Sequence, residues 1–230
     1  MIKGKVKENL NEFEFEIELL LGSLHERTGY IYYFDLLQET FLRASKHLII
    51  DSQQFKKELE EECPENKQSL IKSNEGVVNP LIETLYKSYF ITLCSELEII
   101  LTKVNEIIER YYNENSFFPL KAREGDFKSL LDGKKTTKAF IIETLKQHKI
   151  LTTYNYIRNG LIHSKNCKES PEFIKLKTYI TNGKINNLKI IDNEKGFRFL
   201  ITDIDFIINY SKVIILFFQN LINNSVKNRK

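Results

Sequence analysis

The chain of 230 residues is 42% hydrophobic and 28% charged, a balance that excludes the weakly hydrophobic, highly charged class of disordered proteins. Its formal net charge of +3 is too small to indicate by itself a polycation that binds nucleic acid. No apolar segment follows the first residues, and the longest apolar run, Val213–Phe218, is far shorter than the roughly 20 residues of a membrane-spanning helix. We therefore expect a cytoplasmic protein without membrane contact.

The first third of the chain has the apolar spacing of helices. Apolar side chains recur every three or four residues over 10–24 and again, after Gly29, over 30–48, which predicts two amphipathic helices. A short acidic helix is predicted over 55–62, and it should end at Cys63-Pro64 because the residue before proline disfavours helical geometry.

Residues 64–79 are polar and contain several turn-forming side chains, so they are predicted to form a linker. Asn79-Pro80 has the character of a helix start, with asparagine as the N-cap and proline in the first turn. From there an apolar stripe continues to Tyr111 and predicts the longest helix of the chain. We place the domain boundary in the linker, with an N-terminal helical extension over 1–78 and a helical bundle over 79–230.

The remaining chain is predicted to contain two helices, a β-hairpin and a final helix capped by Thr202 or Asp203. These elements cover residues 136–147, 150–164, 185–191 with 196–201, and 203–222. The predicted fold class is therefore all-α: an up-and-down helical bundle with a short β-hairpin inserted before the last helix.

Charge and cysteine spacing limit the chemistry that the chain can carry. Residues 1–60 hold 8 Lys and Arg against 11 Asp and Glu, net −3, whereas residues 121–170 hold 11 against 5, net +6. The basic stretch includes the helix predicted over 150–164, although a solvated helical face would show a similar bias. Three widely separated cysteines without CxxC spacing predict reduced thiols, and neither a metal site nor a cofactor site is indicated.

The helix predicted over 150–164 carries the residues with chemical potential. Asn159 and His163 are four residues apart, about 40° around the helix axis, and Arg158 can reach the same edge with its long side chain. Arginine binds phosphate bidentately, and histidine exchanges a proton near neutral pH. Gly160 would leave the helix surface open between them. Alternatively, the cations could simply suit a helix C-terminus, with Gly160 marking its fraying.

The segment Arg158-Asn159-Gly160-Leu161-Ile162-His163 resembles the active-site motif of the HEPN superfamily, in which an arginine precedes a histidine by several residues near the end of a late helix. The resemblance covers about residues 79–225. It implies a metal-independent endoribonuclease, a homodimer whose two motifs form one composite site, and a role as a defence or toxin effector.

On this resemblance, Arg158 would hold the scissile phosphate, His163 would act as the general acid/base, and Asn159 would orient the phosphate or His163. A carboxylate of the preceding long helix, Glu96 rather than Glu98, would hold Arg158 in place; alternatively, these glutamates are solvated residues of the helix surface. The expected partners are an RNA substrate, a second copy of the chain, and a cognate antitoxin or defence protein. The alternative is a catalytically inactive HEPN-like module that binds a partner protein or a nucleotide.

Overall fold

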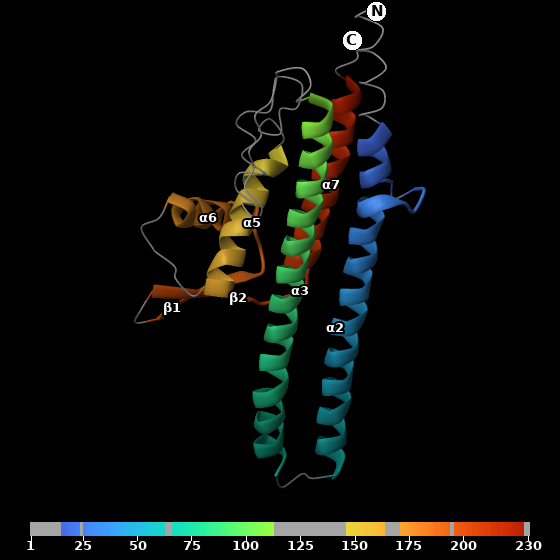
Figure 1. Cartoon of the computed structure of the whole chain (residues 1–230). Coiled ribbons are helices and arrows are strands. Elements are labelled where there is room, and N and C mark those ends of the chain that lie inside the picture. Colours follow the sequence, from blue (N-terminus) through green and yellow to red (C-terminus); the bar gives the residue numbers. More distant parts are fainter. Residues whose placement is uncertain are drawn as a thin grey trace, which may run out of the picture. The chain divides into compact units, whose positions relative to one another are not determined.

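The computed structural model describes residues 15–23, 25–62, 66–112, 146–163, 171–193 and 196–227. Its elements are, in chain order, α2 (Gly29–Glu62), α3 (Lys67–Tyr112), α5 (Lys146–His163), α6 (Pro171–Thr181), β1 (Leu188–Asn193), β2 (Gly196–Ile201) and α7 (Asp205–Lys227), as Figure 1 shows. The predicted fold class is confirmed, because these segments are mainly helical and one antiparallel hairpin precedes the last helix. None of the described helices combines the length and apolar character that a bilayer-spanning segment requires.

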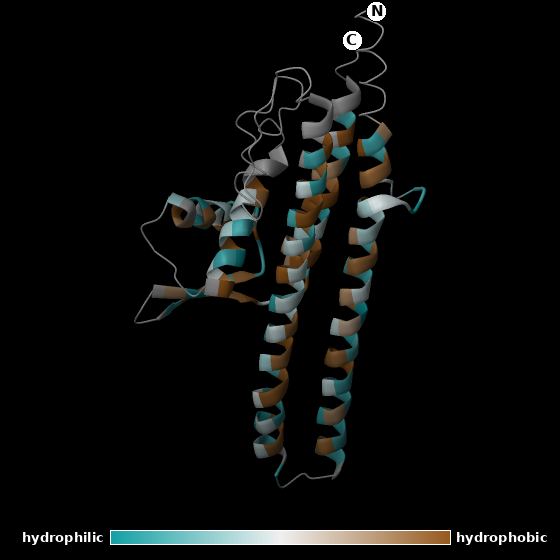
Figure 2. Ribbon diagram, viewed as in Figure 1, coloured by the Kyte–Doolittle hydropathy of each residue, from teal (hydrophilic) through white to brown (hydrophobic). Residues whose placement is uncertain are grey.

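The N-terminal helices are longer and fewer than the sequence predicts. The stripe over 30–48 and the acidic segment over 55–62 belong to one helix, α2, since no proline or glycine lies between them. Hydrophobic and hydrophilic bands alternate along this helix (Figure 2), as expected for an element with one buried face.

The prediction of a linker over 64–79 is also wrong, because residues 67–79 form the first part of α3. Pro80, expected to start that helix, lies inside it. An ion pair of 2.8 Å between Lys56 Nζ and Glu75 Oε1 joins this first part of α3 to α2. A glycine, a proline and a polar composition therefore do not prevent this segment from being helical, since local propensity is only a weak guide. The division of the chain at residue 78 stays a prediction.

The chain divides into two compact units, each built from several separate segments. Unit 1 comprises residues 1–36, 92–159 and 209–230, and unit 2 comprises residues 37–91 and 160–208. In unit 1, fully buried apolar side chains from α2, α3, α5 and α7 form the core. Phe34 of α2 contacts Phe218 of α7 at a ring-centroid distance of 6.1 Å, and Tyr154 of α5 contacts Tyr210 of α7 at 4.5 Å.

A tight turn in unit 1 connects the helical residues 15–21 to α2. Gly22 and Gly29 both have positive φ, and Ser23 and Thr28 exchange two backbone hydrogen bonds of 3.1 Å between them. A Cβ atom on Gly29 would lie 2.6 Å from the Cα of Gly22. Only glycine fits both positions, which explains why the predicted break occurs at Gly29.

In unit 2, stacked aromatic rings join the segments. Phe41 of α2 and Tyr89 of α3 stack at 3.6 Å, and Phe90 of α3 meets Phe206 of α7 edge to face at 5.1 Å. Helix α6 was not predicted, although Pro171 at its first position is a typical helix start. The predicted cap of the last helix is confirmed for Asp203, whose Oδ1 accepts a hydrogen bond from the backbone N–H of Asp205 at 2.8 Å.

Candidate functional site

Helix α5 presents the motif beside a buried stripe. Leu151, Tyr154, Ile157 and Leu161 are at most 9% exposed, which confirms the apolar face that their spacing predicts. The helix continues through Gly160, which is buried, to His163, so the glycine does not end it. The side chain of His163 lies outside the described part of the structure.

Arg158 is half-buried and makes two side-chain contacts within unit 1. Its Nη1 donates a hydrogen bond of 3.0 Å to Oδ1 of the adjacent Asn159, and its Nη2 lies 3.5 Å from Oε2 of Glu98 on α3. The side chains of Arg158 and Glu98 are only 22% and 19% exposed. Among the described residues, Arg158 Nε has no hydrogen-bond partner. The guanidinium group is therefore held on one side while a buried N–H donor remains available.

The carboxylate that contacts Arg158 is Glu98, not Glu96 as expected. Glu96 instead contacts Tyr33 of α2, and its charge and hydrogen bond add to burial in raising the pKa of that phenol. The glutamates are two positions apart in the sequence, so they lie about 160° apart around α3 and meet different neighbours. Both glutamates lie beside the same apolar stripe in the sequence, so the sequence could not show which of them pairs with Arg158.

The pKa of Glu98 is raised by burial and lowered by the charge of Arg158, and burial has the larger effect. The charge of Arg158 therefore favours the ionised form of Glu98 against the effect of burial. The interaction with Glu98 holds the guanidinium group of Arg158 in place on α5. An arginine that binds phosphate would be held in this way, and so would an arginine in a purely structural ion pair.

A buried polar cluster lies beside this ion pair in unit 1. Cys94, four residues before Glu98 on α3, interacts with Tyr210 of α7, and the charges of Arg158 and Glu98 act on its thiol. Burial raises the pKa of Cys94 to about 12 and raises the pKa of both Tyr154 and Tyr210. These groups stay protonated near neutral pH, so they can support the ion pair but cannot act as nucleophiles or bases.

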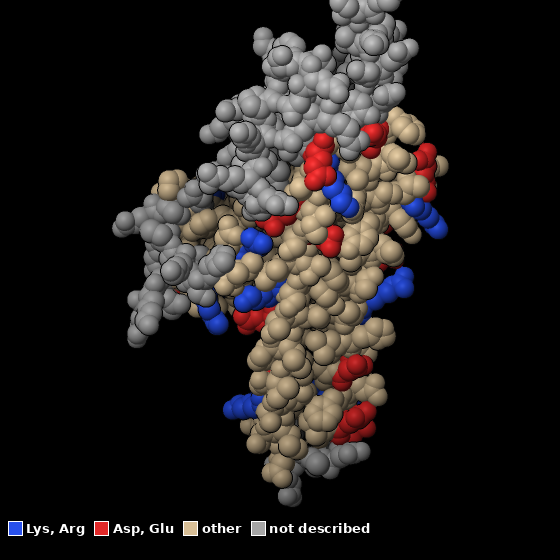
Figure 3. Space-filling view, in the orientation of Figure 1, with Lys and Arg blue, Asp and Glu red and all other residues tan. Residues whose placement is uncertain are grey.

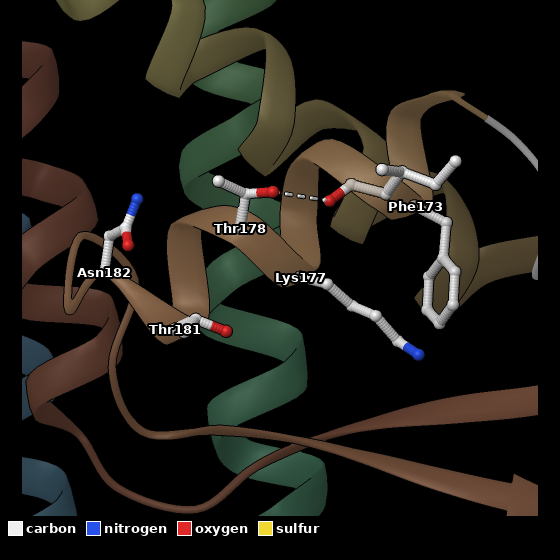
Figure 4. Close-up of a pocket in the computed structure, with 6 residues that line it drawn as sticks. Phe173, Lys177, Thr178, Thr181 and Asn182 are labelled. Atoms are coloured by element: carbon white, nitrogen blue, oxygen red, sulfur yellow. Dashed lines mark hydrogen bonds between the residues drawn. The ribbon is translucent and has the colours of Figure 1, made fainter.

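Hollows lined by other residues also occur in the described part of the structure. In unit 1, an apolar hollow of about 620 Å³ is lined by Leu19, Leu20, Tyr30, Tyr33 and Ile107, with Glu16 among the lining residues. In unit 2, a smaller and more polar hollow of about 360 Å³ lies along α6 (Figure 4). Within the described ranges, no three His, Cys, Asp or Glu side chains gather as they would around a metal ion.

On the face drawn in Figure 3, described acidic and basic side chains are interspersed over the helices rather than separated into regions of one sign. A functional site must therefore be identified from its local groups. The structure brings Arg158, Asn159 and Glu98 together and places His163 at the end of the same helix. Comparisons with family models, with curated proteins and with solved structures found no match to this chain.

Proposed function

We propose that this protein is a metal-independent endoribonuclease of the HEPN type, active in the cytoplasm as a homodimer with a composite site. The observation that carries the proposal is the restraint of Arg158 by Asn159 and Glu98 on the helix that ends at His163. An arginine that stabilises phosphoryl charge and a histidine that transfers protons can together cleave an RNA phosphodiester without a metal ion.

The proposed reaction is attack of a ribose 2′-hydroxyl on the adjacent phosphorus. A new P–O2′ bond forms, the bond from phosphorus to the 5′-oxygen breaks, and a 2′,3′-cyclic phosphate and a 5′-hydroxyl result. Arg158 stabilises the negative charge that develops on the phosphoryl oxygens, and Glu98 keeps its guanidinium group in place. His163 takes the 2′-hydroxyl proton or returns one to the leaving oxygen. Its counterpart in a second copy of the chain performs the other transfer.

A catalytically inactive module that binds a partner protein or a nucleotide is the second candidate. It is favoured by the same ion pair, because a guanidinium group that is 22% exposed and already contacts Glu98 has fewer donors free for a phosphate. In the nuclease, by contrast, substrate would have to reach Nε or displace one of the existing contacts. The two candidates therefore predict different effects of losing Arg158.

The test is an RNA cleavage assay in excess EDTA with wild-type protein, His163→Ala, Arg158→Lys and the control His47→Ala. His47 is an exposed residue of α2 and should be dispensable. We expect cleavage by wild type and His47→Ala, and a loss of roughly 10²–10⁴-fold in rate for His163→Ala. Arg158→Lys should remain badly impaired because it loses the bidentate fork.

The products should carry 2′,3′-cyclic phosphate ends, and light scattering should give the mass of a dimer. If the protein acts as a toxin or defence effector, its expression should arrest growth and His163→Ala should relieve the arrest. A wild-type protein that cleaves no RNA, or whose His163→Ala variant cleaves normally, would leave the binding module as the better account.

A further inference from the structure

The β-hairpin of unit 2 has two faces of different character. Its register pairs Leu188 with Ile201, Ile190 with Phe199 and Asp192 with Phe197. Side chains opposite one another in an antiparallel pair point to the same side. Phe197, Phe199 and Ile201 are at most 4% exposed, so this side is the buried face of the hairpin.

The other face of the hairpin, its outer face, is basic. It is formed by Lys189 opposite Leu200 and Arg198 opposite Ile191. Both cations are exposed, and the two aliphatic side chains between them are half-buried. Among the described residues of the hairpin, Asp192 is the only acid; it pairs with Phe197 rather than with either cation, and it is exposed.

Helix α6 packs against the buried face through an aromatic stack, and one of its lysines lies over that stack. The ring of Phe173 stacks on that of Phe197 at a centroid distance of 4.3 Å, and the ammonium group of Lys177 lies 4.8 Å from the centroid of Phe173. In Figure 4 the side chains of Phe173 and Lys177 extend from α6 toward the strands, while Thr178 lies on another side of the helix. Lys177 thus lies next to Phe173, on the side of the hairpin that α6 covers.

We propose that the outer face of the hairpin, with Lys189 and Arg198 as its cations, binds the sugar–phosphate backbone of single-stranded RNA. Lys189 and Arg198 are diagonal neighbours on the two strands, and residues in this arrangement are typically about 7–8 Å apart along the backbone. Cations at this spacing can contact successive phosphates, and Ile191 and Leu200 offer an apolar surface to the ribose and bases. The inference rests on the proposed function and names the surface that would hold its substrate.

The charge pattern favours RNA over an acidic protein as the ligand. The hydrogen-bonded strands hold the two cations at a fixed spacing, which suits the regularly spaced phosphates of RNA. Contacts between cations and phosphates do not depend on the base sequence. The aromatic stack of Phe173 on Phe197 holds α6 on the hairpin, so the surface needs no rearrangement to bind.

The experiment measures fluorescence anisotropy of labelled oligouridine over a range of salt concentrations, with His163→Ala as the background so that no RNA is cleaved. In that background, Lys189→Gln with Arg198→Gln is compared with the control pair Lys46→Gln with Lys87→Gln. The control residues are exposed on α2 and α3, so their loss changes net charge equally. A swapped pair, Lys189→Arg with Arg198→Lys, keeps both charges on the hairpin.

The hairpin glutamines should weaken binding by roughly tenfold near physiological salt and flatten the slope of log K against log salt by about 1–1.5. The control pair and the swapped pair should bind like the parent. Equal losses in the hairpin and control pairs, no binding of RNA by the parent, or equally effective competition by polyglutamate would overturn the inference. Loss of binding in the swapped pair would also overturn it, because the charges would then not carry the contact.

The same data separate this inference from the proposed function. If the wild type cleaves RNA while the hairpin glutamines bind it as tightly as the parent, the inference fails and the nuclease assignment stands. If RNA binds through the hairpin but the wild type cleaves none in any condition, the assignment fails and the inference stands. Circular dichroism should show the same helical content in all variants, because the substituted side chains are exposed.

Discussion

The contact between Arg158 and Glu98 predicts an energetic coupling that a double-mutant cycle can measure. At 3.5 Å, two unit charges attract by about 5 kcal/mol at an effective dielectric constant of 20, but burial of both groups offsets most of this gain. Exposed pairs couple by about 0–1 kcal/mol, and removing one partner of a buried pair costs about 3–5 kcal/mol. For side chains about one-fifth exposed, we expect a coupling of about 1–2 kcal/mol at pH 7.

The cycle compares the free energies of unfolding, measured in urea, of wild type, Arg158→Ala, Glu98→Ala and the double variant. Its matched control is the pair Arg43 and Glu39 on α2, which is closer, at 3.3 Å, but has side chains 77% and 56% exposed. That pair should couple by only about 0.3–0.5 kcal/mol. The comparison therefore separates the effect of burial from that of distance.

The coupling should also depend on pH. Loss of Arg158 removes the charge that lowers the pKa of Glu98, so burial will raise that pKa further above its ordinary value of 4.5. A carboxyl group with a raised pKa in the folded state destabilises the fold as pH rises through that pKa. The cost of Arg158→Ala should therefore be larger at pH 7 than near pH 4.5. A coupling near zero at pH 7, or a cost that does not change with pH, would refute the pairing.

Three further predictions follow from glycine, cysteine and metal chemistry. Gly29→Ala should lose at least about 2 kcal/mol of stability in urea unfolding, because its φ is +65° and the new Cβ would lie 2.6 Å from Gly22. Gly76→Ala, where nothing lies within 4 Å, should instead gain about 0.5–1 kcal/mol, and a similar loss at both sites would contradict this. Cys94, with a pKa of about 12, should stay unmodified when the folded protein is alkylated at pH 8 and its peptides are mapped by mass spectrometry. Cleavage of RNA should persist in EDTA, and activity that returns only when magnesium is added would refute the metal-independent mechanism.

Local patterns in the sequence were sufficient for the elements whose cause is local. The stripe of Leu151, Tyr154, Ile157 and Leu161 is spaced at the helical period, and it is the buried face of α5. The hairpin follows from two β-prone runs, and the cap at Asp203 follows from a side chain that bonds its own backbone. In each case the interacting groups are close in the chain, so their order alone specifies the structure.

Contacts between helices decided the rest. Residues 67–79 are helical although their composition suggests a linker, because local propensity is a weak guide and these residues continue directly into the strongly patterned part of α3. Glu96 and Glu98 both flank the buried stripe of α3, and nothing in their spacing says which neighbour each one meets. The structure places α2 with its Tyr33 at Glu96 and α5 with its Arg158 at Glu98. The sequence by itself determined which residues of a helix are buried, and only the packing of one helix against another determined which charges meet, because that depends on groups far apart in the chain.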